Sequence, residues 1–142
     1  MSESSIPAHV LAFLEDMKVP GVLSTLRADG SPITSAVWYA VLDGDVIIST
    51  PAGRPKARNA RRDERVSFMV DTKEMPYRGV AIEGVAEVLD DPGAELMLTI
   101  SRRYLGTDLP ERIRERAAAG DRAIIRIRPL RVRPWNFAEP RP

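Results

Sequence analysis

The alternation of apolar and polar positions predicts a chain built mainly from β-strands. Apolar side chains recur at every second position, with few interruptions, in residues 21–27, 32–42, 65–71, 79–89 and 122–132. A period of two is typical of strands with one buried face, and the short apolar run at residues 46–50 also suits a strand. Asp29-Gly30 and Asp43-Gly44 separate the first three strands and are strong hairpin signals. The first half should therefore open as an antiparallel meander.

Other segments carry the spacing and the end signals of helices. Residues 7–17 and 91–105 each place apolar side chains on one helical face, and in the second helix these are Leu96, Met97, Ile100 and Tyr104. Residues 110–119 form a further helix, and residues 51–63 read as a loop that enters a short one. We expect a single domain over residues 1–142, mainly β with peripheral helices (an α+β chain), arranged as a small antiparallel barrel.

Composition excludes several kinds of chemistry. The chain has no cysteine, which excludes thiol catalysis and cysteine-bound metals. It has one histidine, His9, so catalytic triads and zinc motifs built around histidine are excluded as well. We therefore expect no metal site. A net charge of +1 argues against a protein that coats nucleic acid. The chain contains no apolar run of membrane-spanning length and no signal peptide, so we expect a cytoplasmic location away from membranes.

The most informative segment is the basic stretch that follows the strand at residues 46–50. The strand ends in Ser49 and Thr50, a Pro-Ala-Gly loop follows, and Arg54, Lys56 and Arg58 come next. Hydroxyls, free N–H groups at a helix start and guanidinium donors together predict a phosphate site. A basic helix face that contacts only solvent is the simpler alternative. Nucleic-acid binding is a weaker one, because the segment has no aromatic residue for base stacking.

The order of these segments resembles a known family. The run GVLSTLRADGSPITSAVWYAVLDGDVIISTPAGRPKARNARRDERVSFMVD at residues 21–71, followed by YRGVAIEGVAEV from Tyr77, is similar to the pyridoxamine 5′-phosphate oxidase-like proteins. The closest resemblance is to the flavin- and deazaflavin-dependent oxidoreductase branch that uses coenzyme F420. The resemblance implies an antiparallel split β-barrel of the FMN-binding type. It also implies a homodimer with a cofactor at the subunit interface.

The resemblance also assigns residues to the cofactor. It implies that the phosphate is held by a group at the basic segment, namely Ser49, Thr50, Arg54, Lys56 and Arg58. It places the flat ring beside the strand that carries Ala36, Val37 and Trp38. Trp135 resembles the position at which a partner subunit closes the pocket. Ordinary packing in the barrel or at an interface is the alternative for Trp38, and an interface anchor is the alternative for Trp135.

These assignments predict an F420-dependent oxidoreductase that transfers hydride from the reduced deazaflavin to an unidentified small molecule. The cationic residues Arg61 and Arg62 lie further along the short helix, where the anionic tail of F420 could run. An FMN-dependent enzyme of the pyridoxamine-phosphate-oxidase type and a non-catalytic cofactor carrier remain as alternatives. No catalytic residue stands out, and Tyr39, Tyr77 or solvent could supply a proton.

Overall fold

The structure, a computed structural model, describes residues 6–137 and is built around one curled sheet. Seven antiparallel strands follow the order β2-β1-β5-β6-β7-β4-β3. The strands are β1 (Gly21–Leu26), β2 (Pro32–Val37), β3 (Tyr39–Leu42), β4 (Asp45–Pro51), β5 (Arg65–Asp71), β6 (Gly79–Asp90) and β7 (Arg122–Trp135). The helices are α1 (Ala8–Asp16), α2 (Pro55–Arg62), the short 3-10 helix η1 (Pro92–Ala94), α3 (Glu95–Leu105) and α4 (Glu111–Ala119).

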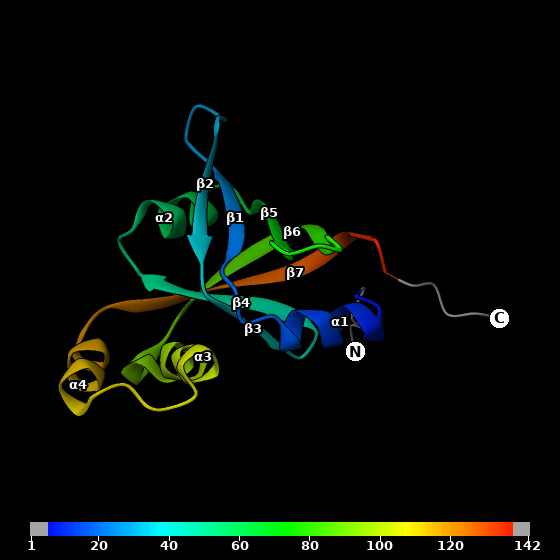
Figure 1. Ribbon diagram of the computed structural model, residues 1–142. Coiled ribbons are helices and arrows are strands. Elements are labelled where there is room, and N and C mark those ends of the chain that lie inside the picture. The colour runs from blue at the N-terminus through cyan, green and yellow to red at the C-terminus, as the bar shows by residue number, and fades with distance from the viewer. Residues whose placement is uncertain (1–5, 138–142) are drawn as a thin grey trace.

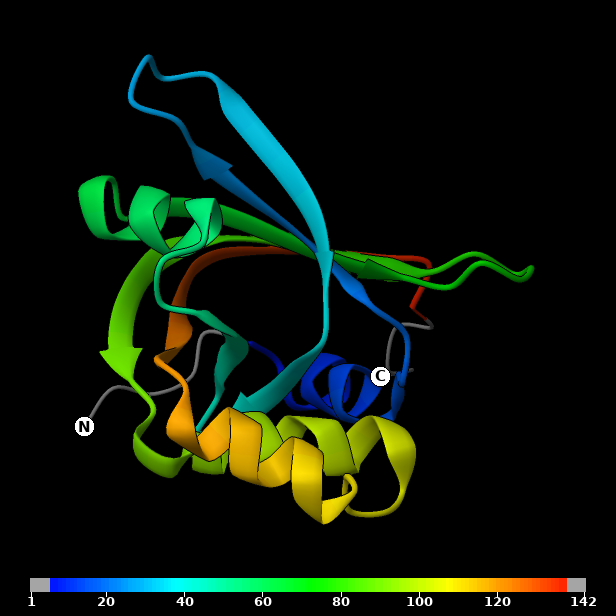
Figure 2. The same ribbon diagram turned by 90° about the vertical axis from the view of Figure 1, so that its left-hand side faces the viewer.

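The chain crosses from one edge of the sheet to the other at Trp38. β2 pairs only with β1, whereas β3 pairs with β4 at the opposite edge. The expected single strand over residues 32–42 is therefore wrong, and it divides into two at Trp38. At this crossing the backbone N–H of Tyr39 donates to the hydroxyl of Tyr104, at 3.2 Å. This crossing curls the sheet into a half-barrel, which confirms the predicted split β-barrel (Figures 1 and 2).

Alternation along the strands gives the sheet two packed surfaces. The inner one forms the main core, in which Leu23, Phe68, Ile82 and Ile125 are almost fully buried with apolar side chains of α1. On the other surface α3 covers the end formed by β3, β4 and β7, where Ala40, Ile47, Ile100 and Ile124 pack together. Figures 1 and 2 show α2 near the β1–β2 hairpin and α3 with α4 at the opposite side.

The local signals for turns and helix starts were mostly correct. Asp43 and Gly44 both have positive φ, at 50° and 80°, as a two-residue type I′ hairpin requires. The helix expected over residues 91–105 is instead interrupted, because Gly93 and Ala94, the last two residues of η1, take positive φ just before α3 begins. Asp91 still caps α3 by accepting the N–H groups of Leu96 and Met97, each at 3.0 Å. Those two side chains are half-buried rather than buried.

Within residues 6–137, no helix is both long and apolar enough to cross a membrane.

Candidate functional site

The basic segment forms a tight connection between β4 and α2. The Ala52 N–H donates to the Asp121 carbonyl at 2.9 Å, which fastens the loop to the start of β7. Arg54 then takes the N-cap position with extended backbone, and Pro55 follows as the first helical residue. No side chain within residues 6–137 caps this helix start. The first-turn N–H of Lys56 is therefore available to an anion, at the positive end of the helix.

Arg54 and Lys56 act on each other electrostatically at this helix start. The pKa of Lys56 lies below its ordinary value, first because the ammonium is partly buried and second because Arg54 is positive and close. Two like charges held together favour a bound anion, which would relieve both effects. Arg58 lies one turn further along and is exposed. Arg54 and Lys56 therefore lie close together, and the predicted role of these three residues toward a phosphate remains a prediction.

Arg61 and Arg62, near the end of α2, form hydrogen bonds with backbone carbonyls. Arg61 donates to the Ala52 carbonyl at 2.7 Å, and Arg62 donates to the Leu26 carbonyl at 2.9 Å. The two guanidinium groups therefore bind carbonyls of different elements. Both side chains are nevertheless exposed, so their predicted place along the path of an anionic tail remains a prediction. Together with the buried bond from Asn59 to Thr25, at 3.2 Å, they fix α2 on β1 and on the loop.

The two hydroxyls at the end of β4 lie on opposite faces of the strand. Thr50 is 2% exposed and donates to the Pro51 carbonyl at 3.2 Å, so its predicted place in one cluster with Ser49 is wrong. Ser49 instead accepts a hydrogen bond from a terminal nitrogen of Arg122, at 2.7 Å. Arg122 was not among the residues predicted from the sequence, because it lies at the start of β7 and reaches Ser49 only through the β4–β7 pairing.

Trp38 and Ser49 line the same hollow, of about 290 Å³, with Arg122. The rest of its wall is formed by three residues of α3, by one residue before α4 and by one within it, namely Met97, Ile100, Ser101, Leu109 and Ile113. Trp38 is 41% exposed and stacks on Tyr104, with ring centroids 4.7 Å apart and planes 9° from parallel. The neighbouring ring-side candidates differ, since Ala36 is exposed and Val37 is buried in the main core.

Trp135 lies at the other end of β7. It pairs with Gly79, where a Cβ would come 2.5 Å from the Trp135 ring, so a side chain at this glycine would displace the ring. Arg122 and Trp135 are separated by the whole length of the strand, about 40 Å if it were straight. Within one chain Trp135 is therefore remote from the hollow beside Trp38. Its predicted role toward a partner subunit remains a prediction.

Of the two tyrosines considered as proton donors, Tyr39 is unsuited. Its side chain is completely buried, and its hydroxyl donates to the Leu14 carbonyl at 2.7 Å. Burial raises the pKa of Tyr39 far above its ordinary value. Tyr77, by contrast, is 53% exposed on the loop between β5 and β6.

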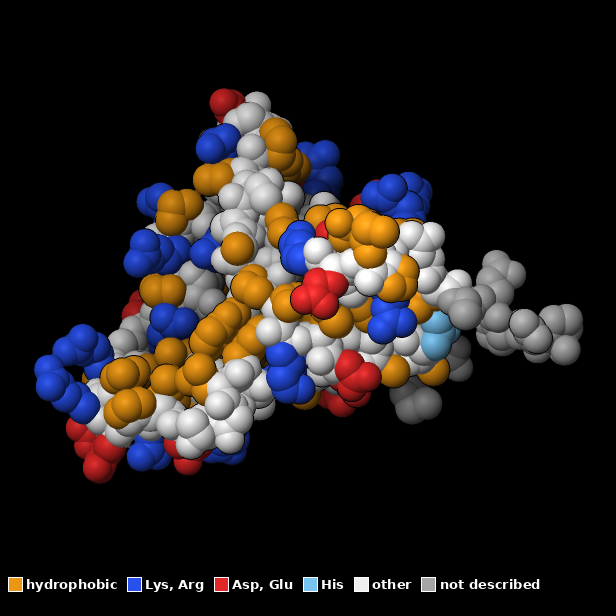
Figure 3. Space-filling view, in the orientation of Figure 1, with side chains coloured by type: hydrophobic (Ala, Val, Ile, Leu, Met, Phe, Trp, Pro, Cys, Tyr) orange, Lys and Arg blue, Asp and Glu red, His pale blue; other side chains and the backbone are white. Residues whose placement is uncertain are grey.

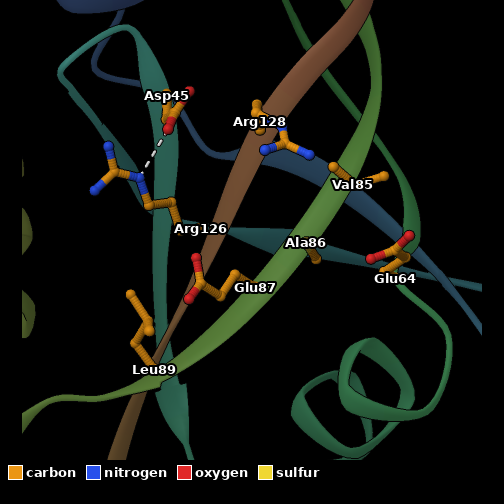
Figure 4. A pocket seen from close by; sticks show the side chains of 8 residues that line it. All are labelled: Asp45, Glu64, Val85, Ala86, Glu87, Leu89, Arg126 and Arg128. Carbon is orange, nitrogen blue, oxygen red and sulfur yellow. Dashed lines mark hydrogen bonds and ion pairs between the residues drawn. The ribbon is translucent and has the colours of Figure 1, made fainter. Parts of the chain in front are cut away.

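A second hollow, of about 420 Å³, lies on β4, β6 and β7 and has mixed charge (Figure 4). Arg126 donates to Asp45 at 2.7 Å, and Arg128 shares the surface with Glu64 and Glu87. Because acidic groups accompany the arginines, this hollow is a poorer site for phosphate than the start of α2. No cluster of three or more potential metal-binding side chains of His, Cys, Asp or Glu occurs within residues 6–137.

Comparison with known proteins identifies the family. Residues 6–136 match the model of the pyridoxamine 5′-phosphate oxidase family, so the chain belongs to this flavin-binding family, as its sequence predicted. A conserved hypothetical protein from Mycobacterium tuberculosis is 32% identical over 96% of this chain and 88% of its own, with a TM-score of 0.79.

Two further solved structures share the fold. An F420 reductase is 30% identical over 90% of this chain and 98% of its own, with a TM-score of 0.75. An FAD-binding protein from Mesorhizobium loti is 20% identical over 89% of this chain and 92% of its own, with a TM-score of 0.60. The last similarity concerns the fold alone.

Proposed function

We propose that this protein is an oxidoreductase that binds coenzyme F420, with the cofactor phosphate at the start of α2. The observation that carries the proposal is the adjacency of Arg54 and Lys56, whose mutual repulsion contributes to the lowered pKa of Lys56. An uncapped helix start beside these cations supplies a backbone donor as well. The residues present therefore fit a phosphate group. On a helix face that contacts only solvent both cations would be fully hydrated, whereas Lys56 is partly buried beside Arg54.

In this reading the protein supplies binding and orientation rather than a catalytic side chain. When bound, reduced F420 would supply a hydride from its deazaflavin ring to an electrophilic acceptor. Arg54 and Lys56 would hold the phosphate, and Arg58 lies next along the helix toward an anionic tail. The exposed face of Trp38 would border the ring. Tyr39 holds its proton in the core, so a proton needed by the product would come from solvent or from Tyr77.

The choice of F420 over FMN rests on the cations of α2 and, more strongly, on the similarity to an F420 reductase. Arg61 and Arg62 bind backbone carbonyls, which leaves Arg58 as the principal cation for a polyglutamate tail. Three cations would also suffice for FMN, so an FMN-dependent enzyme is the second candidate. The F420 reductase at 30% identity supports F420. A protein that binds the cofactor without turning it over is a third candidate, because no catalytic side chain stands out.

We also propose a homodimer with the cofactor near its interface. The sheet surface of β4, β6 and β7 away from the main core carries Leu89, which is 38% exposed, beside the hollow of mixed charge. A two-fold interface brings the same surface of both subunits together, so a surface that carries both signs of charge can complement itself. Such an arrangement would let Trp135 of one subunit approach the cofactor of the other.

The test is F420 affinity in charge-removing variants. Arg54→Ala and Lys56→Ala should each lose about 1.5–3 kcal/mol of binding free energy, because each removes a charge-assisted bond to phosphate, which corresponds to one to two decades in Kd. Arg114→Ala removes the same charge from exposed α4 and serves as the control. Similar small losses in all three variants would show that the cluster is only a solvated face.

A turnover assay separates an enzyme from a carrier. Reduced F420 mixed with the protein and a panel of electrophilic alkenes and quinones should be oxidised faster than in buffer. Tight F420 binding without any catalysed oxidation across the panel would favour the carrier.

A further inference from the structure

The hollow beside Trp38 combines apolar walls with a single cation. Met97, Ile100, Leu109 and Ile113 contribute hydrocarbon surface, and Trp38 contributes an aromatic edge. The only charged side chain in the wall is that of Arg122. A wall of this composition matches a molecule that is mostly apolar and carries one negative group.

Arg122 has hydrogen-bonding capacity that the protein does not use. One terminal nitrogen donates to Ser49, but its Nε is buried and has no partner within residues 6–137. The acidic charge that acts on Arg122 is that of Asp91, which accepts the N–H groups of Leu96 and Met97 as the cap of α3. Partial burial lowers the pKa of Arg122, so its charge is incompletely compensated. The Nε is closed to solvent, so a ligand could reach only the terminal nitrogens. A partly buried guanidinium that forms no ion pair within residues 6–137 is costly and is expected to gain from a bound anion there.

The protein leaves the apolar side of the hollow uncovered. None of the residues of α4 is buried, and Ile113 on this helix is 47% exposed although it lines the hollow. Figure 3 shows an apolar band that runs from the region of α4 across α3 toward the end of β2. Apolar surface beside a partly buried cation is unfavourable in water and gains when an amphipathic ligand fills the space.

We propose that this hollow binds a small apolar carboxylate, with the carboxylate on Arg122 and Ser49 and the hydrocarbon part between Trp38 and α4. The binding itself goes beyond the proposed function. Its use as the site of the hydride acceptor rests on that function and narrows the acceptor to an apolar acid.

The test measures ligand binding by the fluorescence of Trp38, in protein free of any flavin or F420. A Trp135→Phe background leaves Trp38 as the only tryptophan. Octanoate should change this fluorescence saturably, and octanol, which has the same chain without the charge, should bind at least about tenfold more weakly. Equal affinities for octanoate and octanol would overturn the proposal.

Two variants locate the ligand. Arg122→Gln should weaken octanoate about tenfold or more and leave octanol unchanged, whereas Arg128→Gln, on the same strand but outside this hollow, should change neither. Ile113→Glu should abolish octanoate binding by repulsion. Leu105→Glu, at a position equally exposed at 47%, should not. If Arg122→Gln does not fold, the pair of glutamate variants decides the question.

Octanoate binding is measured in protein without cofactor, so its result does not depend on whether the protein binds F420. If octanoate causes no saturable change while Arg122→Gln weakens F420 itself, Arg122 belongs to the cofactor site and the proposal fails.

Discussion

The hydroxyl of Tyr104 holds the point at which the chain crosses between sheet edges. It accepts the N–H of Tyr39 at 3.2 Å and donates to the Val19 carbonyl at 3.0 Å, while its ring stacks on Trp38. Tyr104→Phe removes both hydrogen bonds and keeps the ring. Tyr39 is completely buried, so its N–H would lose its partner, whereas the half-buried Val19 can turn to water. We therefore expect a loss of about 1–3 kcal/mol in the free energy of unfolding.

Urea unfolding of Tyr104→Phe measures this loss. Tyr77→Phe provides the matched control, because Tyr77 is 53% exposed and its hydroxyl is accessible to water, so the same substitution should cost less than about 0.5 kcal/mol. The slope of free energy against urea should not change, since the folded state keeps its shape. If the two variants were equally stable, the Tyr104 hydroxyl would not be what holds the crossing.

The pKa of Lys56 is lowered, so the ammonium loses its charge at a lower pH than an ordinary lysine does. F420 affinity should therefore fall as pH rises toward that pKa, and Lys56→Arg should remove the fall. The same dependence of affinity on pH in both proteins would contradict a role of Lys56 at the phosphate. Arg103→Met should lower the free energy of unfolding by about 2–4 kcal/mol, because Arg103 donates to the Leu14 and Met17 carbonyls at 2.7 Å. Arg102→Met loses only an exposed ion pair and should lower it by less than about 1 kcal/mol. Equal losses in the two arginine variants would refute this assignment. Sedimentation should give about twice the 15.8 kDa chain mass, and a monomer that binds F420 tightly would contradict the interfacial site.

Sequence periodicity predicted the strands well because a half-buried strand must alternate. The same pattern says nothing about which neighbour a strand joins. Residues 32–42 read as one continuous strand, yet the first half pairs at one sheet edge and the second half at the other. The break at Trp38 depends on Tyr104, which lies 65 positions after Tyr39 in the chain. No signal in the sequence near Trp38 could have predicted the crossing.

The candidate site shows the same division between local and distant causes. The cations Arg54 and Lys56 adjoin a helix start, so their closeness was predictable from the sequence. The hydrogen bonds of Arg61 and Arg62 were not predictable, because the carbonyls that they bind belong to the loop and to β1. Arg122 comes 73 positions after Ser49, and only the pairing of β4 with β7 brings the two together.

The central claim is that the basic helix start serves F420, and a side-by-side titration of apo-protein with F420 and FMN tests it most directly. We expect F420 to bind more tightly at low salt, with a preference that decreases as salt screens the exposed Arg58 and that shrinks in Arg58→Ala. Arg114→Ala should leave the preference unchanged. Binding of FMN at least as tight as that of F420 at low salt would contradict the account.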